Sequence, residues 1–321
     1  MALDPQAEQL RALLESLALP PLDQMTVAEA RAAEEGLAAL QGEPEPVAEI
    51  RDIVVPGPGG DLPVRVYLPA AGPGGPDAPA AGQRPLTVYF HGGGWVIGSI
   101  ELLDRPCRAS ANATGAVVAS VDYRLAPEHK FPAAVEDAYA ATSWLAEHAG
   151  DFDADPGRVV VAGDSAGGNL AAVTAILARD RGAPTVSAQV LFCPATAAPT
   201  HSKFASYTEA AEGYMLTRSD MNWFWEHYTR SPADDDDPLA APLNTPDLSG
   251  LPPALVIVAG YDPLRDEGLA YGRRLEEAGV AVTVRSFDGQ MHDFFWAMGA
   301  VDTAARHAIN DIDAFISTIR T

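Results

Sequence analysis

Short apolar segments alternate with helical stretches through most of the chain, and this alternation is the feature that most restricts its fold. The segments are rich in β-branched residues, which is typical of strands buried on both faces of a parallel sheet. Helical periodicity between them, as over 131–149, indicates helices that cover such a sheet. The predicted strands are 86–90, 116–123, 158–163, 188–193, 254–260 and 280–287.

A hairpin precedes these strands. Residues 50–55 and 62–68 alternate apolar and polar positions around the turn sequence PGPGGD, which predicts two antiparallel strands. Residues 70–85 are rich in Gly, Pro and Ala and predict a surface loop. Together these patterns predict an α/β fold with about eight strands, mostly parallel, flanked by helices.

Two stretches of the chain lack strand patterns. Leucines recur at helical spacing over 6–17, a second helix is predicted to begin at Thr26, and 196–250 contains an aromatic helix capped by Thr217. We interpret the first stretch as an element appended to the core and the second as an insertion into it. The predicted division is N-terminal helices (1–48), the first part of the core (49–195), an insertion (196–250) and the second part of the core (251–321).

The charge balance restricts the partners. The chain has 21 Lys and Arg against 44 Asp and Glu, a net charge of −23, which disfavours binding to nucleic acid or to an anionic membrane surface. Cys107 and Cys193 are too few for a disulfide framework in a chain of this length. The first residues lack the pattern of a signal peptide, and the apolar runs are too short to span a bilayer. We therefore expect a soluble cytoplasmic protein.

The sequence GDSAGG places Ser165 in a G-x-S-x-G motif, directly after a predicted strand and before a predicted helix. A nucleophile on such a tight turn needs small neighbours, and the helix behind it presents free N–H groups to a developing anion. A glycine turn that serves only packing is the alternative. A phosphate-binding loop is disfavoured because no lysine follows the glycines.

The second motif is HGGGW, at 91–95. Glycines directly after a buried strand leave backbone N–H groups uncovered, so this loop can donate to an oxyanion together with the N–H of Ala166. His91 itself is a less suitable base, because a histidine before such a loop is more often structural.

A serine nucleophile needs a base and an orienting carboxylate. Asp262 follows the strand at 254–260 and His292 follows the last strand, so both lie at carboxyl ends of strands, where open α/β sheets bind ligands. The competing acid is Asp266 and the competing base is His307, and both fall within helical patterns.

Five motifs follow one another along the chain: HGGGWVIGS, DYRLAPEHKFPAAVEDA, GDSAGGNLA, DPLRDEG and MHDFF. With these motifs in this order, the chain resembles the hormone-sensitive-lipase family of bacterial carboxylesterases over about residues 50–321. The resemblance implies an α/β-hydrolase fold with a helical cap, built from the N-terminal cap helices (1–48) and the cap insertion (196–250). It implies Ser165 as nucleophile, His292 as base and Asp262 as orienting acid, with Gly93, Gly94 and Ala166 as oxyanion donors and no cofactor. Asp293 departs from the pattern, since many members have glycine there.

The substrate site is less defined by the sequence. We expect Trp95, next to the oxyanion glycines, to line it, together with Trp223 and Trp225, although the aromatic residues of that helix equally suit the cap core. No metal-binding motif is present, and DDDD at 234–237 suits a solvated loop better than a calcium site. Members of this family often form homodimers, and residues 280–318 are the candidate surface for such pairing.

The expected activity is hydrolysis of short- to medium-chain carboxylic esters, small-molecule substrates, through an acyl-enzyme. Hydrolysis of an amide, carbamate or lactone by the same residues is the first alternative. The second is a non-catalytic binding protein on the same fold, and the presence of His292 speaks against it.

Overall fold

The structure, a computed structural model, describes residues 2–70, 83–210 and 212–319. These ranges contain an eight-stranded sheet in the order β1-β2-β4-β3-β5-β6-β7-β8. The α/β fold with a mostly parallel sheet is therefore confirmed. Most of the loop predicted at 70–85 lies outside the described residues. The strands are β1 (Glu49–Gly57), β2 (Gly60–Leu68), β3 (Arg84–Phe90), β4 (Val117–Val121), β5 (Ala154–Asp164), β6 (Val186–Phe192), β7 (Ala254–Tyr261) and β8 (Val282–Met291).

The strand directions bring several strand ends to one edge. β1 pairs with β2 and β2 with β4 in antiparallel fashion, whereas every pair from β4 through β3 to β8 is parallel. In the central strands β-branched residues fill the middle of the sheet, as in β4, where every residue is buried. The carboxyl ends of β3, β5, β7 and β8 consequently lie side by side, and the segments that follow them share one edge of the sheet.

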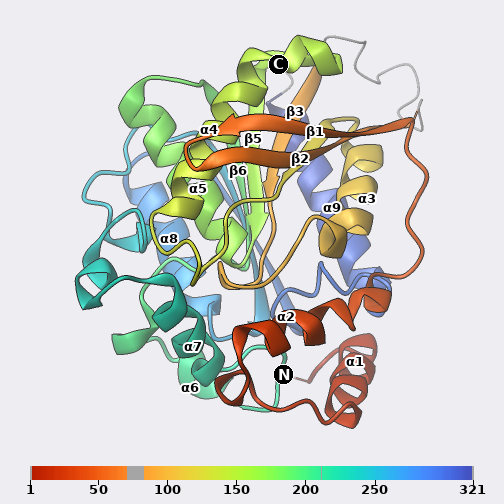
Figure 1. Ribbon diagram of the computed structural model, residues 1–321, viewed down its shortest axis with the longest axis vertical. Helices are drawn as coiled ribbons and strands as arrows, with labels where there is room; N and C mark the ends of the chain where they lie inside the picture. Colours follow the sequence, from red (N-terminus) through yellow and green to blue (C-terminus); the bar gives the residue numbers. More distant parts are fainter. Residues whose placement is uncertain (1, 71–82, 211, 320–321) are drawn as a thin grey trace.

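Helices cover both faces of the sheet (Figure 1). The helices α4 (Ala133–Glu147), α5 (Ala166–Arg181) and α8 (Arg265–Glu277) lie on one face, and α3 (Asp104–Thr114) and α9 (Asp302–Thr318) on the other. The apolar side chains accordingly divide into two buried clusters, one on each face. α5 is buried along nearly its whole length, so the helix that begins at the serine motif is held rigidly.

The remaining helices gather beyond the carboxyl edge of the sheet. α1 (Pro5–Ser16) and α2 (Val27–Glu35) come from the N-terminus, whereas α6 (Ser206–Glu209) and α7 (Arg218–Tyr228) follow β6, yet Figure 1 shows the two pairs side by side. Capping boxes begin α2 at Thr26 and α7 at Thr217, as their sequences predict. The N–H of Leu22 donates to Asp220, which joins the two segments.

Short 3₁₀ turns connect these elements. They are η1 (Leu22–Gln24), η2 (Ala38–Gln41), η4 (Glu101–Leu103), η5 (Ala149–Phe152), η6 (Pro199–His201), η7 (Pro232–Asp236) and η8 (Pro242–Asn244). Across the described residues, none of the helices combines the length and the apolar character needed to cross a bilayer.

Candidate active site

Ser165 occupies a strained turn between β5 and α5. Its backbone has φ 53° and ψ −115°, a conformation that side-chain-bearing residues rarely adopt. The turn is crowded, since a Cβ added to Gly167 would lie 1.9 Å from the carbonyl oxygen of Phe90. The N–H of Ser165 donates to the carbonyl of Phe192 over 2.8 Å. Neighbouring strands therefore hold the serine in place against the local strain.

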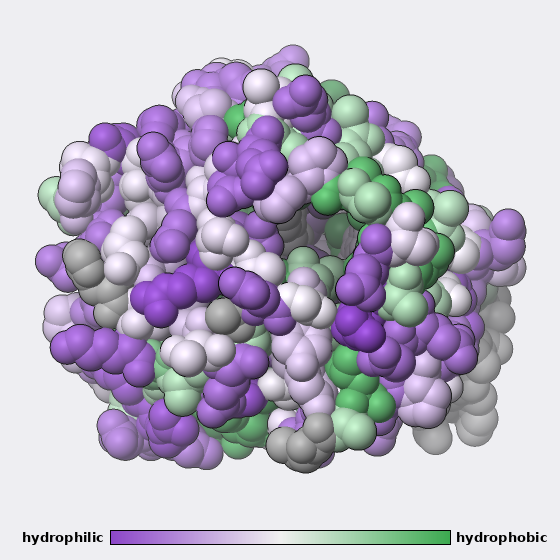
Figure 2. Space-filling view, turned by 90° about the horizontal axis from the view of Figure 1, so that it is seen from below, coloured by the Kyte–Doolittle hydropathy of each residue, from purple (hydrophilic) through white to green (hydrophobic). Residues whose placement is uncertain are grey.

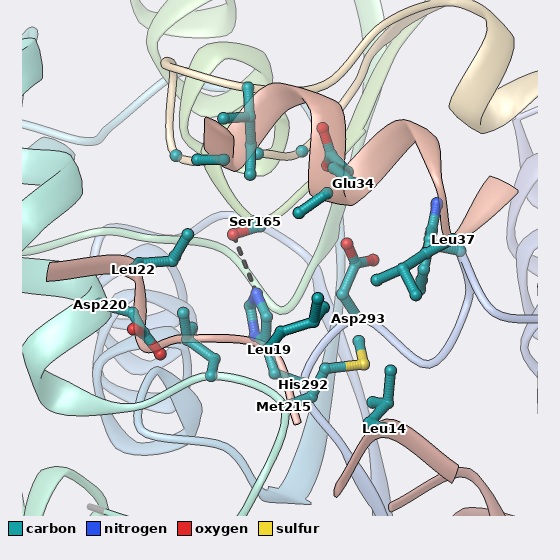
Figure 3. Close-up of a pocket in the computed structure, with 18 of the residues that line it drawn as sticks. Leu14, Leu19, Leu22, Glu34, Leu37, Ser165, Met215, Asp220, His292 and Asp293 are labelled. Carbon is teal, nitrogen blue, oxygen red and sulfur yellow. Dashed lines mark hydrogen bonds between the residues drawn. The ribbon is translucent and has the colours of Figure 1, made fainter. Parts of the chain in front are cut away.

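His292 and Asp262 reach Ser165 from the ends of β8 and β7. The Oγ of Ser165 lies 2.9 Å from Nε2 of His292 (Figure 3). Nδ1 of His292 lies 2.8 Å from Oδ2 of Asp262. All three side chains are buried. In this arrangement Nδ1–H donates to the carboxylate, which leaves Nε2 able to accept a proton from the serine hydroxyl.

Asp262 is oriented by two further donors. The N–H of Leu264 donates to its other oxygen over 2.8 Å, and the buried thiol of Cys193 donates to the same carboxylate. Burial holds the pKa of Cys193 well above its usual range, so the thiol keeps its proton. Sequence reasoning missed Cys193 in this role, and its position at the end of β6, beside β7, was the available signal.

Cys193, Asp262 and His292 also form a set of potential metal ligands, with donor atoms within 4.8 Å of one another. The set fits a metal poorly. Nδ1 of His292 already donates to Asp262, and the thiol of Cys193 donates to the same carboxylate, so hydrogen bonds within the set occupy its donor atoms. We therefore assign these residues to the hydrogen-bonded chain that ends at Ser165.

The glycine loop after β3 passes beside Ser165. Gly93 and Gly94 have φ of 102° and 56°, which glycine adopts without strain. The carbonyl of Gly93 accepts from the N–H groups of Val96 and Ile97, and this turns the loop back on itself. Ala166, at the start of α5, is fully buried. The predicted oxyanion donors thus come from two segments on either side of the serine.

His91 has a structural role. Its ring is fully buried and stacked on Tyr123 at a centroid distance of 4.3 Å, and Nδ1 lies 2.7 Å from the carbonyl of Gly92. Burial lowers the pKa of His91 to about 4, so the ring is neutral and donates to Gly92. The alternative acid and base also lie elsewhere, since Asp266 pairs with Arg265 and His307 packs against Phe287.

A cavity of about 530 Å³ opens above Ser165 and His292. Figure 2 shows its mouth as a hollow bordered on one side by hydrophobic residues. The wall is mainly apolar and is built over the glycine loop by residues 11–37 from the N-terminal part and residues 213–224 from the segment after β6. Its apolar members include Leu14, Leu19, Leu22, Met25, Leu37, Met215, Leu216 and Phe224.

The prediction that Trp95, Trp223 and Trp225 line the substrate site differs from their placement, since none of the three is among the residues that line this cavity. Trp95 is buried and stacks on Tyr228 at 4.2 Å, and the indole N–H of Trp225 donates to Asp235. α7 instead turns Phe224 toward the loop, where a Cβ on Gly94 would lie 2.2 Å from its ring. Trp223 and Trp225 lie on α7, whose rotation is fixed by these contacts, and Trp95 packs against Trp225 and Tyr228 of that helix.

Acidic side chains form part of the cavity wall. Glu34 of α2 accepts from the N–H of Gly98 over 2.6 Å, and Asp293 lies near it in the wall (Figure 3). Asp164 also lines the cavity. Burial raises the pKa of Glu34 to about 7, and the charge of Asp164 adds to the shift. Sequence reasoning had noted Asp293 only as a departure from a pattern, and had assigned no role to Asp164.

The comparisons with known proteins agree with this geometry. A family model described as the alpha/beta hydrolase fold matches residues 87–296. The carboxylic ester hydrolase LipN of Mycobacterium tuberculosis is 43% identical over 289 residues, which cover 86% of this chain and 73% of LipN. An arylesterase of Saccharolobus solfataricus is 39% identical over 251 residues, 78% of each chain.

Solved structures show the same likeness. A hyperthermophilic esterase of Pyrobaculum calidifontis has a TM-score of 0.89 and 44% sequence identity, with both chains fully covered. An ester hydrolase from the metagenome of Lake Arreo has a TM-score of 0.91 and 39% identity, over 98% of each chain. The chain therefore belongs to the α/β hydrolases, in the family that resembles hormone-sensitive lipase.

Proposed function

We propose that this protein is a serine carboxylesterase in which Ser165 is the nucleophile, His292 the general base and Asp262 the acid that orients it. The observation that carries the proposal is the unbroken hydrogen-bonded chain from Asp262 through His292 to Ser165 at the floor of an apolar cavity. The names of the relatives, carboxylic ester hydrolase and arylesterase, point to the same reaction.

In the first half of the reaction, the Oγ of Ser165 attacks the ester carbonyl carbon while Nε2 of His292 takes the hydroxyl proton. The carbonyl electrons move to oxygen, and the N–H groups of Gly93, Gly94 and Ala166 bind the oxyanion. Each such donor contributes about 3 kcal/mol to the transition state. The intermediate then collapses, the bond to the alcohol oxygen breaks, and His292 gives that oxygen its proton.

In the second half, water attacks the acyl-enzyme. His292 takes a proton from the water, the same N–H groups bind the second oxyanion, and the carboxylic acid leaves as Ser165 regains its proton. Asp262 stabilises the imidazolium in both halves and keeps Nδ1 protonated, so that Nε2 always faces the reacting atoms.

The cavity supports short- to medium-chain esters as substrates. Leucine, methionine and proline side chains of the cap close over Ser165 and suit an apolar acyl or alcohol group of limited length. The cap division proposed from the sequence, 1–48 and 196–250, accounts for the cavity residues outside the core. Amides, carbamates and lactones remain the alternative substrates, because the same residues hydrolyse them when the leaving group fits.

The edge strand supports homodimerisation. β8 pairs only with β7 among the described strands, and Val284 on it is 37% exposed. We expect two copies to meet through residues 280–318. Light scattering of the wild type should give a dimer mass and Val284→Lys a monomer mass. A monomeric wild type would contradict the pairing.

The function is tested by hydrolysis of p-nitrophenyl esters from acetate to palmitate, with Ser165→Ala as the matched variant. We expect turnover of the short chains, a decline with chain length, and loss of nearly all activity in the variant. A folded wild type that hydrolyses none of these esters would refute the ester assignment, and amides or pure ligand binding would then be tested.

A further inference from the structure

Two acids, the buried Asp164 and the half-buried Asp293, flank the reacting residues in the sequence. Asp164 directly precedes Ser165, and Asp293 directly follows His292. Their side chains are hydrogen-bonded to each other, although neither reaches Ser165 through a hydrogen bond. The contact therefore joins the turn that carries the nucleophile to the loop that carries the base.

One oxygen of each acid lacks any other donor among the described residues. The hydroxyl of Tyr89 donates to Oδ1 of Asp164 over 2.6 Å. Apart from the contact between the two acids, Oδ2 of Asp164 and Oδ1 of Asp293 are buried and have no donor among the described residues. A proton held between the two carboxyl groups would satisfy both oxygens.

The pair also explains the first glycine of the oxyanion loop. A Cβ on Gly92 would lie 2.2 Å from Oδ2 of Asp164 and 3.2 Å from Oδ2 of Asp293. Gly92 thus lets the loop backbone lie directly against both acids. The pair is in contact with the three segments that bear Ser165, His292 and the predicted oxyanion donors.

Electrostatics assigns the proton to Asp293. Burial raises the pKa of Asp293 well above its usual range, and the charge of Asp164 raises it further. Burial also raises the pKa of Asp164, but the hydrogen bonds from Tyr89 and Asp293 oppose this shift. The other titratable groups that face the pair are Glu34 from α2, Tyr89 from β3, Tyr123 after β4, Asp262 after β7, His292 after β8, and the protonated thiols of Cys107 and Cys193.

We propose that Asp293 and Asp164 share one proton, and that this acid–carboxylate pair holds the histidine loop against the nucleophile turn so that His292 keeps its reach to Ser165. The proposal rests on the proposed esterase function for its kinetic consequences. Asp293 is a positioning residue in this scheme, because it acts on the reaction through the place of His292.

Two structural details support a positioning role. Asp293 has φ 51°, a conformation that costs energy for a residue with a side chain, so its carboxyl contact must outweigh that cost. The carboxylate of Asp164 is also near enough to His292 to interact electrostatically with the imidazolium. Loss of the shared proton would place two carboxylates in contact, and their repulsion would push the histidine loop away.

The kinetic test compares Asp293→Asn with Asp293→Ala. The asparagine amide can donate to Asp164 and cannot ionise, so kcat should stay within about threefold of wild type and the decline of activity at alkaline pH should diminish. The alanine variant has no donor, and we expect kcat to fall about tenfold or more with a smaller change in KM. Asp61→Asn, on the exposed end of β2, is the control and should leave the profile unchanged.

Equal effects of Asn and Ala, or a pH profile of Asp293→Asn that superimposes on that of the wild type, would overturn the proposal. A second measurement needs no active variant. Carbon-13 carboxyl NMR of the aspartate-labelled wild type should show an aspartic acid that titrates far above the usual range and is missing from Asp293→Asn. Ordinary titration of every aspartate would also overturn it.

The two proposals fail separately. If the NMR signal is present but the wild type hydrolyses no ester, the esterase function fails and the shared proton stands. If hydrolysis depends on Ser165 but the signal is absent, the function stands and the acid pair fails.

Discussion

Arg31 anchors the cap helix α2 to the core, and its removal gives a local effect that can be worked out from the structure. Its Nε–H donates to the carbonyl of Val96 over 2.9 Å and its Nη2–H to that of Ala126 over 3.0 Å. The guanidinium also forms a bidentate pair with Glu128, with both distances 2.8 Å. Val96 lies just beyond the glycine loop, so Arg31 ties the cap to the proposed oxyanion donors.

The two carbonyl contacts should dominate the anchoring energy. A hydrogen bond from a charged donor contributes about 1.5 kcal/mol or more, so Arg31→Ala should weaken the docking of α2 by about 3 kcal/mol. The Glu128 carboxylate is 54% exposed, and a pair of this kind adds at most about 1 kcal/mol. A loss of about 3 kcal/mol corresponds to roughly a 100-fold increase in local opening.

Hydrogen exchange of the α2 amides measures that opening directly. In Arg31→Ala these amides should exchange about 100-fold faster while the amides of β5 stay unchanged. The value of kcat/KM should fall, because Ala30, Ala33 and Glu34 of the same helix line the cavity. Glu128→Gln is the matched control and should change α2 exchange by no more than about threefold.

Comparable effects of Arg31→Ala and Glu128→Gln would refute the reasoning, since the ion pair and not the carbonyl contacts would then dominate. A uniform rise in exchange across the sheet would also refute it, because α2 would then open only with the whole protein.

Three other substitutions probe the buried acids and the serine turn. Burial raises the pKa of Glu267 from 4.5 to about 8, so the wild type loses stability as pH rises through that range. At neutral pH the free energy of unfolding of Glu267→Gln, measured with denaturant, should therefore exceed that of the wild type by about 3 kcal/mol. A difference that does not grow with pH would contradict this. Above a pH of about 7, the pKa of Glu34, the ionised carboxylate should make the wild type prefer neutral esters over anionic ones. Glu34→Gln should reduce the ratio of the two kcat/KM values about tenfold. An unchanged ratio would count against an acidic wall. Gly167→Ala should abolish folding, because its Cβ would meet the carbonyl of Phe90. Gly150→Ala is the control and should purify normally, because there is open space around Gly150. A soluble, active Gly167→Ala would contradict the crowding at the serine turn.

The features predicted from the sequence are those that local patterns determine. The strand, the tight turn and the helix around Ser165 are adjacent in the chain, and both capping boxes depend on residues three positions apart. Asp262 and His292 were identifiable because parallel strands bring their carboxyl ends to one edge. These predictions needed only the strand directions and no knowledge of side-chain packing.

The features that sequence reasoning missed depend on tertiary packing. Helical periodicity shows that α7 is aromatic. It does not show that Phe224 lines the cavity beside Gly94 while Trp223 and Trp225 do not. The thiol of Cys193 acquires its role only when β6 lies beside β7. The contact between Asp164 and Asp293 joins strand ends far apart in the sequence, and no local pattern distinguishes such an acid from a solvated one.

Covalent labelling with a p-nitrophenyl phosphonate tests the central claim most directly, because it requires a nucleophile activated by a base and needs no knowledge of the natural substrate. Intact mass and peptide mapping should find a single adduct per chain, on the peptide that contains Ser165. Ser165→Ala should take up no label, and the labelling rate of His292→Ala should be lower than that of the wild type by a factor of about 1,000 or more. Labelling at another residue, or equal labelling of Ser165→Ala, would contradict the assignment of Ser165 as the nucleophile.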